Sequence, residues 1–407
     1  MIKIADNRPQ PKDPGRFSKA HEFDAETETD FDDAHRLFDD LRARCPVAHS
    51  NDLDGFWLLT RYKDIADSMS DFSLFSTAVQ NVVPRVATAG RRPPLHLDPP
   101  EHTPYRRAIA PLFRRERIDY WRPIVRKMAE DLFAPLVPTG EADICIDFSY
   151  HLPIHVLAEF FMIPAQKAAE IREMGQAFNH ALQTKDFEGL KKTSLFLYEM
   201  AQEIIDDRKL NPRDPGEDPT SALLAARNEG EPLPEDMILG TIRQLLVVGI
   251  IAPTTLLGSV AVHFCRHPDD FTLIKEHPER VADATEELMR LYTPYRGFAR
   301  TPTRDVEIGG RLICEDEPIA LSFAAANRDP EVYSDPATFK LDREGEPPHI
   351  AFGRGAHQCI GAPLARLMLT AAVAVFTEKV NGFELAGPTP MTTWPEYGPY
   401  SVPVRFL

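Results

Sequence analysis

Cysteine is scarce in this sequence, and it shows no pairing pattern. The five cysteines are odd in number and widely spaced: Cys45, Cys145, Cys265, Cys314 and Cys359. This arrangement excludes a framework of paired disulfides and indicates a reducing compartment. No C-x-x-C pair and no second cluster of cysteine and histidine accompanies them, which argues against a structural zinc site.

Long apolar runs and basic stretches are missing as well. No uninterrupted apolar run reaches the ~18 residues that a membrane-spanning helix requires, and the N-terminus has no apolar leader segment with a cleavage site. Acidic residues outnumber basic ones by 62 to 46, for a formal net charge of −16, so no basic stripe dominates the chain. We therefore expect a cytoplasmic protein that binds neither a membrane nor nucleic acid.

A dividing linker is the third absence. Residues 1–30 are rich in charge and proline without periodicity, which predicts an extended N-terminal arm. No Gly/Ser-rich linker interrupts residues 31–407, so we expect a single domain there. Helical spacing of apolar residues prevails over residues 101–270, whereas residues 300–326 alternate in strand fashion. The expected fold class is mostly α with a minor β region.

What the chain does have is one cysteine in a glycine-hinged loop, Phe352-Gly-Arg-Gly-Ala-His-Gln-Cys359-Ile-Gly361. An apolar helix is expected directly after it, and the N-terminus of a helix favours a thiolate. Three interpretations of Cys359 are open: a small buried apolar side chain, a nucleophile with His357 as its base, or a ligand of a soft metal. The nucleophile is weakened because Cys359 and His357 lie two residues apart on a tight loop and tend to point apart.

The pattern F-x-x-G-x-x-x-C-x-G resembles the haem-binding loop of the cytochrome P450 family. The resemblance implies that Cys359 is the axial ligand of the iron in haem b (iron protoporphyrin IX). Electron donation from this sulfur promotes cleavage of the O–O bond in the family. Phe352 can shield the sulfur on one side. The resemblance extends over residues 30–407 and implies the triangular, mostly α prism of the family.

Further residues resemble the family's contacts to the two haem propionates, which need cationic or donor partners. His102 and Arg106 are one helical turn apart and match the family's H-x-x-x-R segment. Arg300 and His357 match two further contacts. The resemblance therefore implies a set of four propionate partners spread over three parts of the chain.

Glu287 and Arg290 lie at i and i+3 on one expected helix face. Alone such a pair is most often a solvated surface pair. Beside the cysteine loop it resembles the family's E-x-x-R pair, and Arg343 is the expected third partner. The implied role is structural, and a buried network of this kind has to be fully satisfied.

The apolar segment Thr241 to Arg266 departs from the family. The acid and the alcohol that normally relay protons are replaced by Ile251 and Ala252, and Pro253 is expected to bend the helix. Three explanations are open. The substrate supplies a hydroxyl or carboxylate that organises water, residues 254–255 take over the relay through a distorted turn, or the chemistry needs no such relay.

The resemblance implies a haem-thiolate monooxygenase that inserts one oxygen atom from O2 into a small organic substrate, by hydroxylation or O-dealkylation. The alternatives are a peroxide-using or aromatic-nitrating member of the family, or a haem-based sensor without turnover. Gly249 and Ala252 are expected to let O2 approach the iron. The substrate is expected to contact four side chains: Val248, Arg296, Phe298 and Trp394. Arg296 would pair with a substrate carboxylate or carbonyl, or else turn outward to a surface acid.

Local basic charge suggests the electron donor. No reductase domain is recognisable in the chain, so the resemblance implies a separate ferredoxin and ferredoxin reductase, acting on a monomer. In the family an acidic donor docks on the face beside the cysteine. The arginines that would form this face are Arg106, Arg107, Arg114, Arg115, Arg117, Arg354 and Arg366.

Overall fold

The computed structural model describes residues 19–25, 30–85, 90–163 and 186–407, and in between residues 167, 169–171, 173–174, 177, 181 and 184. Most of the expected N-terminal arm, residues 1–18 and 26–29, lies outside this described part. The described remainder of the arm packs on the body. The Glu22 N–H donates to the carbonyl of His49 (2.8 Å), and Phe23 is buried.

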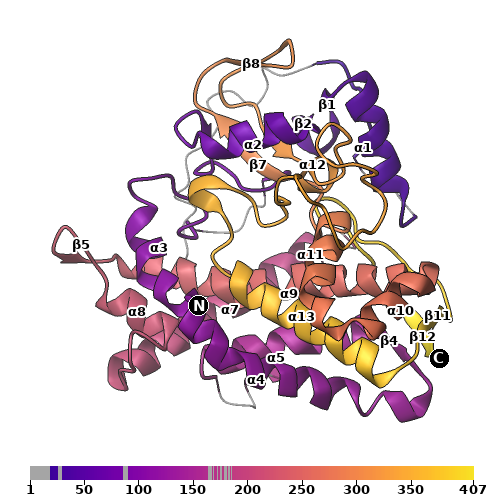
Figure 1. Cartoon of the computed structure of the whole chain (residues 1–407). Helices are drawn as coiled ribbons and strands as arrows, with labels where there is room; N and C mark the ends of the chain where they lie inside the picture. Colours follow the sequence, from indigo (N-terminus) through magenta and orange to yellow (C-terminus); the bar gives the residue numbers. More distant parts are fainter. Residues whose placement is uncertain are drawn as a thin grey trace.

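Helices form the body of the molecule, and Figure 1 traces them along the chain. In chain order they are α1 (Asp33–Arg44), α2 (Tyr62–Ser70), α3 (Thr103–Ile109), α4 (Arg115–Phe133), α5 (His151–Phe160), α7 (Phe187–Leu210), α8 (Pro219–Ala225), α9 (Glu235–Arg266), α10 (Pro268–Glu276), α11 (Val281–Leu291), α12 (Phe323–Ala326) and α13 (Ala362–Lys379). Short turns of 3-10 or π type join several of them, including η2 (Ala110–Phe113), η4 (Ile144–Ser149) and η6 (Gly355–His357).

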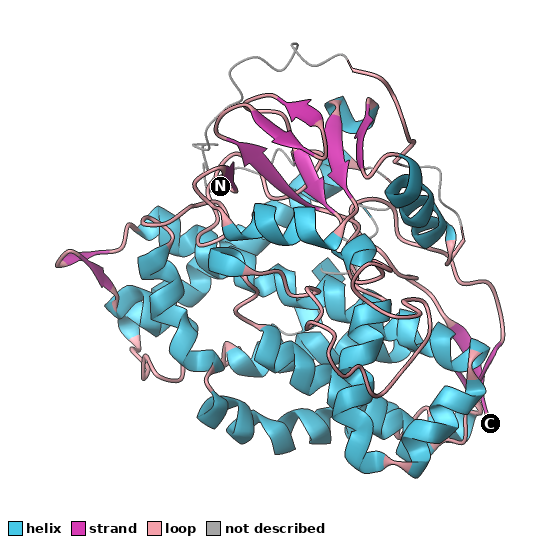
Figure 2. Ribbon diagram, turned by 45° about the horizontal axis from the view of Figure 1, so that its top comes forward, coloured by secondary structure: helices cyan, strands magenta, loops and turns pink. Residues whose placement is uncertain are grey.

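Strands are short and gather mainly at one side of the helical body, as Figure 2 shows. They are β1 (Val47–Ser50), β2 (Phe56–Leu59), β3 (Phe75–Ser76), β4 (Glu141–Asp143), β5 (Arg227–Asn228), β6 (Glu231–Pro232), β7 (Phe298–Pro302), β8 (Val306–Ile308), β9 (Arg311–Ile313), β10 (Ile319–Leu321), β11 (Phe383–Leu385) and β12 (Pro403–Phe406). The largest sheet has the order β1-β2-β10-β7-β3 and is antiparallel except for the pair β2–β10. A mostly α fold with a minor β region confirms the expected fold class.

The long helix α9 runs through the middle of the body. It is apolar and long enough to cross a membrane, yet most of it is buried inside the protein, so its composition is that of a core helix. Glu235 and Asp236 in its first turn favour the helix dipole. The helix continues through Pro253 as one element. Helices α5, α7, α8, α10 and α13 and the turn η4 all contact it.

Two glycines of α9 allow neighbouring segments to approach the helix backbone. A Cβ on Gly240 would lie 2.0 Å from the carbonyl oxygen of Arg91, and a Cβ on Gly258 would lie 2.5 Å from Sγ of Cys145. Both distances are far below van der Waals contact, so a side chain at either position would push the loop at Arg91 or the turn η4 away. Glycine is therefore required at both positions for the close packing around α9.

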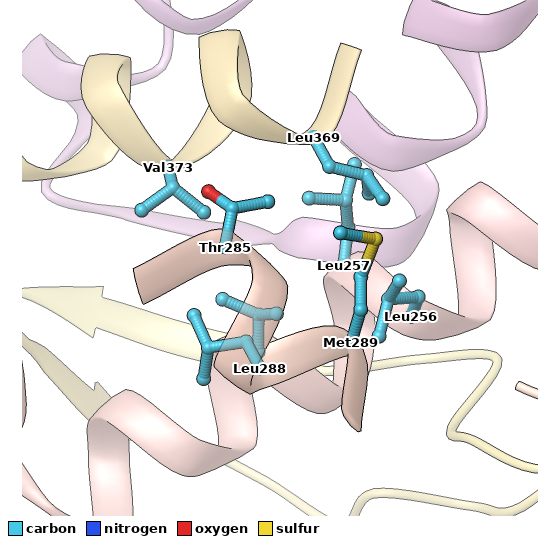
Figure 3. A pocket seen from close by; sticks show the side chains of 8 residues that line it. Leu256, Leu257, Thr285, Leu288, Met289, Leu369 and Val373 are labelled. Carbon is cyan, nitrogen blue, oxygen red and sulfur yellow. The ribbon is translucent and has the colours of Figure 1, made fainter. Parts of the chain in front are cut away.

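A small packing gap lies between α9, α11 and α13 (Figure 3). It is lined by Leu256, Leu257, Val260, Thr285, Leu288, Met289, Leu369 and Val373. The gap does not admit a water molecule. Its single hydroxyl, on Thr285, donates to the carbonyl of Val281 (2.7 Å), so the lining residues offer no free side-chain donor to a ligand. This gap belongs to the packing of the core rather than to a binding site.

Candidate functional site

The loop before α13 holds Cys359 in a defined turn. The Cys359 N–H donates to the carbonyl of Phe352 (2.8 Å), which closes the loop. Gly353 and Gly355 have φ angles of +69° and +74°, a region that favours glycine. A Cβ on Gly355 would also lie 2.6 Å from the carbonyl oxygen of Met69. The spacing of glycines in the sequence is thus explained by backbone conformation and by contact with α2.

The groups around the Cys359 sulfur have opposing effects on the pKa of its thiol. Burial raises the pKa of the thiol, whereas the N–H groups of Gly361 and Ala362 and the charges of Arg106 and Arg366 lower it. Cys359 is nevertheless exposed to solvent. This exposure contradicts the interpretation as a buried apolar side chain.

The nucleophile interpretation also fails on geometry. Nε2 of His357 lies 3.2 Å from Oγ1 of Thr77 and 3.5 Å from Oδ1 of Asp98, so it is engaged away from the sulfur. Within the described residues, one cluster of side chains could hold a metal ion. It consists of His21, Asp24 and Asp52 and does not include Cys359. Among the described residues Cys359 therefore has neither a base nor a second metal ligand, and a group that brings its own remaining ligands, as haem does, fits it best.

Basic side chains gather beside this loop. The rings of His102 and His357 lie 4.8 Å apart, and burial together with the charges of Arg300 and Arg106 lowers the pKa of His357. The carboxylate of Asp98 hydrogen-bonds His357, and its charge partly offsets the burial that lowers the pKa of Arg300. The four residues expected from the sequence to bind propionates thus lie together with one acid among them.

Burial makes this cluster suited to an anion. Burial lowers the pKa of His102 to about 4 and that of Arg300 to about 10. Neither ring nitrogen of His102 meets hydrogen-bond geometry with a described residue, although the main chain of Ala356 raises its pKa. Nη1 of Arg300 donates to the carbonyl of Ala299 (2.9 Å). Four buried or half-buried basic side chains with only one carboxylate, Asp98, among them fit a cofactor that carries two carboxylates.

One face of α9 is accessible although the rest of the helix is buried. Val248 is 43% exposed, and Leu245, Gly249, Ile251 and Ala252 beside it are partly exposed. Their spacing puts them on adjoining parts of one helix face. Apart from the main chain, this face offers no polar group, so α9 presents an apolar wall.

The hydroxyl groups of the two threonines after Pro253 are not available on the accessible face of α9. The Thr254 hydroxyl donates to the carbonyl groups of Ile250 (2.8 Å) and Ser149 (3.1 Å), and the Thr255 hydroxyl donates to that of Ile251 (3.2 Å). Both side chains are buried. Their hydroxyl protons are therefore committed to backbone carbonyls, which argues against a relay shifted to residues 254–255.

Arg296 has a different environment from the one expected. Its side chain is buried, which contradicts the alternative that it turns outward to a surface acid. Its Nη2 donates to the carbonyl of Thr392 (2.6 Å), and its Nε donates to that of Glu396 (2.5 Å). Burial lowers its pKa to about 10. These contacts give Arg296 the role of joining the segment before β7 to residues 392–396, so we do not retain it as the substrate anchor.

The two aromatic residues expected to contact the substrate differ. Trp394 is buried, and its indole N–H donates to the carbonyl of Val83 (2.7 Å), so it fastens the loop near residue 83. Phe298 is partly accessible, and its ring lies 4.4 Å from that of Tyr295. Phe298 therefore stays a candidate for substrate contact, whereas the indole N–H of Trp394 is already committed.

Sequence reasoning missed three polar residues. Burial and the charges of Glu396 and Cys359 raise the pKa of Tyr295, so its phenol lies in an enclosed place within the electrostatic reach of the sulfur. Burial raises the pKa of the Glu396 carboxyl to about 8. Asp98 could have been found, because it stands just before the segment with His102. Tyr295 and Glu396 meet through a strand-like bridge between distant segments, which no local pattern reveals.

The expected structural network around Glu287 is confirmed. Arg290 donates to both carboxylate oxygens of Glu287 (2.7 and 2.8 Å), and Nε of Arg343 lies 2.9 Å from each of them. Arg290 also donates to the carbonyls of Asn327 and Pro336. The buried charges are thus paired and hydrogen-bonded, as a network of this kind requires.

The expected basic face is smaller than the sequence suggested. Arg117 pairs with Glu217 (3.0 Å), Arg366 pairs with Glu286 (2.6 Å), and Arg106 is half-buried near the sulfur. The ring of Phe113, which directly precedes Arg114, lies against Gly361 of the cysteine loop. Within the described chain, the exposed arginines of the set without an ion pair are Arg107, Arg114 and Arg354.

Comparisons with known proteins agree with this geometry. The family model described as "Cytochrome P450" matches residues 281–382. The chain is 32% identical to Nocardicin C N-oxygenase of Nocardia uniformis subsp. tsuyamanensis, over 87% of this chain and 88% of that protein. It is 30% identical to Linalool 8-monooxygenase of Pseudomonas putida, over 86% and 90% of the two chains.

Solved structures extend the likeness to the whole fold. The LnmA cytochrome P450 hydroxylase from the leinamycin biosynthetic pathway of Streptomyces atroolivaceus S-140 superposes with a TM-score of 0.81 at 29% identity, over 95% of this chain and 100% of that chain. The ligand-free cytochrome P450 TbtJ1 superposes with a TM-score of 0.81 at 27% identity, over 93% and 99%. This likeness confirms the prism fold that the cysteine loop implied.

Proposed function

This chain belongs to the cytochrome P450 family of monooxygenases, and we propose that it inserts one oxygen atom from O2 into a small organic substrate by hydroxylation or O-dealkylation. It is an oxidoreductase, as are the hydroxylases and the N-oxygenase that it resembles. The observation that carries the proposal is the Cys359 sulfur in its closed loop beside a set of buried basic groups, of which His102 has neither ring nitrogen in a hydrogen bond with a described residue.

We propose haem b as the cofactor, with Cys359 as the ligand of its iron. When bound, the haem and its thiolate supply the activation of O2. His102, Arg106, Arg300 and His357 would hold the two propionates by charge and hydrogen bonding. The N–H groups of residues 361 and 362 hold the sulfur as an acceptor, which favours the thiolate that the iron needs.

The apolar wall formed by α9 determines which groups are available for O2 access, substrate contact and proton delivery at the proposed haem site. Gly249 and Ala252 leave room for O2, and Val248 and Phe298 offer apolar contact to a substrate. Ile251 and Ala252 carry no exchangeable proton, and the two threonines that follow have committed theirs to backbone carbonyls. We therefore propose that a hydroxyl or carboxylate of the substrate holds the water that delivers protons.

Electrons would come from a separate ferredoxin and its reductase. The exposed cations Arg107, Arg114 and Arg354 beside the cysteine loop support an acidic donor that docks there. We also propose that residues 31–407 act as one haem-binding domain, that the protein is a monomer, and that it works in the cytoplasm. The single domain is supported by the relatives, which the chain matches over 88% and 90% of their length.

Electron coupling tests the proposed function. A panel of small aromatic acids, terpenoids and fatty acids is first scored by the low- to high-spin shift of the haem. The best substrate is then compared with an analogue that lacks its hydroxyl or carboxylate, and product is measured against electrons consumed. We expect tight coupling with the substrate and diversion of most electrons to hydrogen peroxide with the analogue.

The absent acid and alcohol also favour a second candidate, a peroxide-using enzyme. Such an enzyme would couple poorly to electrons with every substrate and would turn over efficiently with added hydrogen peroxide. That result would overturn the substrate-assisted proposal. Ala252→Thr adds a further check, because a new hydroxyl should improve coupling for the deficient analogue and change the native reaction little.

A further inference from the structure

A charged cluster joins α11 to the start of α13 next to the cysteine loop. Nε and Nη2 of Arg366 donate to the two carboxylate oxygens of Glu286, at 2.6 and 3.0 Å. His349 lies 3.1 Å from the same carboxylate through its Nε2. The Ala351 N–H donates to Nδ1 of His349 (3.2 Å), which leaves the ring proton on Nε2, directed at Glu286. The carboxylate thus accepts three hydrogen bonds from two side chains.

The same arginine covers an aromatic ring of the cysteine loop. The guanidinium carbon of Arg366 lies 4.5 Å from the centroid of the Phe352 ring. The carbonyl of Phe352 in turn accepts the N–H of Cys359 (2.8 Å). A continuous chain of contacts therefore runs from Glu286 on α11, through Arg366 and Phe352, to the residue that carries the sulfur.

This cluster is poorly suited to a role in stability alone. The side chains of Glu286 and Arg366 are 41% and 40% exposed, and both line a hollow of about 290 Å³. Ion pairs that water reaches are screened and contribute little to folding. The planar guanidinium, by contrast, has its orientation set by two parallel hydrogen bonds, and that orientation decides how it lies on the ring.

We propose that Glu286, Arg366 and His349 form a clamp that positions Phe352 and, through its carbonyl, the Cys359 loop. They are positioning residues, because none of them touches the sulfur. The clamp holds the ring against the loop and thereby limits the access of water to the thiolate. Its loosening should stabilise the more negatively charged reduced state of the haem–thiolate centre and raise its reduction potential. The inference rests on the proposed haem ligand.

Two variants separate the clamp from simple electrostatics. Arg366→Lys keeps the positive charge but loses the two parallel hydrogen bonds and the planar contact to the ring. Glu286→Gln keeps the shape but weakens the acceptor. On the clamp proposal both variants raise the reduction potential of the haem-loaded protein, and the double variant shifts it no further than the larger single shift.

Asp283→Asn provides the matched control. Asp283 lies on the same helix and lines the same hollow, but it pairs with Arg280 (2.6 Å), away from the loop. The reduction potential of the Asp283→Asn variant should equal that of the wild type. An unchanged potential in Arg366→Lys, or an equal shift in Asp283→Asn and Glu286→Gln, would overturn the clamp.

Two further measurements keep the result interpretable. His349→Gln, which retains a donor near Glu286, serves if a variant of Arg366 fails to fold, and it should shift the potential in the same direction by less. The red-shifted band of the reduced carbon monoxide complex is recorded for every protein. Its absence from the wild type would refute the proposed ligand, whereas its presence with unshifted potentials in all variants would refute the clamp alone.

Discussion

Residue by residue, the site draws its chemistry from main-chain groups as much as from side chains. Burial raises the pKa of Cys359, whereas the N–H groups at the start of α13 and the charges of Arg106 and Arg366 lower it and would stabilise the proposed thiolate. An imidazole at this position would lack the negative charge that these donors stabilise. The sulfur and its surroundings are therefore matched to one another.

Replacing Cys359 by histidine tests this assignment directly. Cys359→His should abolish the red-shifted absorption of the reduced carbon monoxide complex, because that band requires a thiolate ligand. Spectra of the reduced protein with carbon monoxide decide the matter, with Cys265→Ser as a control that should keep the band. A retained band in Cys359→His would show that the ligand has been assigned to the wrong residue.

Arg296 is expected to matter for stability rather than for substrate charge. Arg296→Leu leaves the carbonyls of Thr392 and Glu396 without their donors, at about 1–3 kcal/mol for each buried acceptor. Urea unfolding should show this loss. Arg405→Leu, which removes an exposed pair with Glu384, should cost less than about 1 kcal/mol.

Ligand binding by the same Arg296→Leu variant completes the test. Anionic and neutral ligands should be affected equally, because the guanidinium is already occupied by the main chain. A variant as stable as the wild type that lost affinity for anionic ligands alone would restore the substrate anchor that the sequence suggested.

Among the elements, α9 depends on close approach at its glycines. Gly258→Ala would place a Cβ 2.5 Å from Sγ of Cys145 and 3.0 Å from Cγ of Pro399. Overpacking of this kind costs about 1–3 kcal/mol. The free energy of unfolding should fall accordingly in urea titrations.

A second substitution checks that the clash is the cause. Cys145→Ala removes the sulfur, so Gly258→Ala should cost less in that background than in the wild type. The contact with Pro399 would remain, and the rescue should be incomplete. Equal costs in both backgrounds would point to the contact with Pro399 rather than to the clash with Cys145.

The link between α11 and α13 should make stability depend on pH. His349 and Arg366 lower the pKa of Glu286 from 4.5 to about 2, against the effect of burial. A carboxyl with a lowered pKa contributes stability above its unfolded value, and this contribution is lost as the pH falls from about 4.5 towards 2. The partial exposure of the pair keeps the effect small.

Glu286→Gln should therefore flatten the acid side of the stability profile. Urea midpoints measured at successive pH values below about 4.5 should fall less steeply in the variant than in the wild type. Asp283→Asn, on the same helix but outside the cluster, should retain more of the wild-type slope. Identical slopes in the wild type and Glu286→Gln would contradict the assigned pairing.

On the scale of the whole molecule, an acidic protein with a net charge of −16 would have to attract the acidic electron donor that we propose. A local group of exposed cations can do this because charges farther than about 10 Å are largely screened at moderate salt. Only the arginines without internal partners are available for that purpose. Arg107, Arg114 and Arg354 meet this condition within the described chain, and Arg117 and Arg366 do not.

Charge reversal should separate these two groups. Arg107→Glu should slow reduction by an acidic ferredoxin and weaken its dependence on ionic strength, with little effect on the substrate-induced spin shift. Arg117→Glu, whose native charge is already compensated by Glu217, should slow reduction less. Stopped-flow reduction at several salt concentrations measures both. A rate that is independent of salt in the wild type would rule out steering by this face.

The sequence by itself determined the features that depend on neighbouring residues. The glycines around Cys359, the helix after it and the spacing of His102 and Arg106 are local patterns, and local backbone geometry dictates their use. The mostly α class follows in the same way from helical periodicity. The pair Ile251 and Ala252 was visible because the register of one long helix needs no knowledge of its neighbours.

Only the tertiary structure decided which polar groups remain available. Arg296 and Trp394 were assigned to the substrate, yet carbonyl groups about 100 and 311 residues away in the chain take up their donors. Glu286 and Arg366 are separated by 80 residues, and their pairing removes one cation from the docking face. A buried donor takes the partner that folding brings to it, because an unpaired one is costly, and no local pattern records which distant segment that will be.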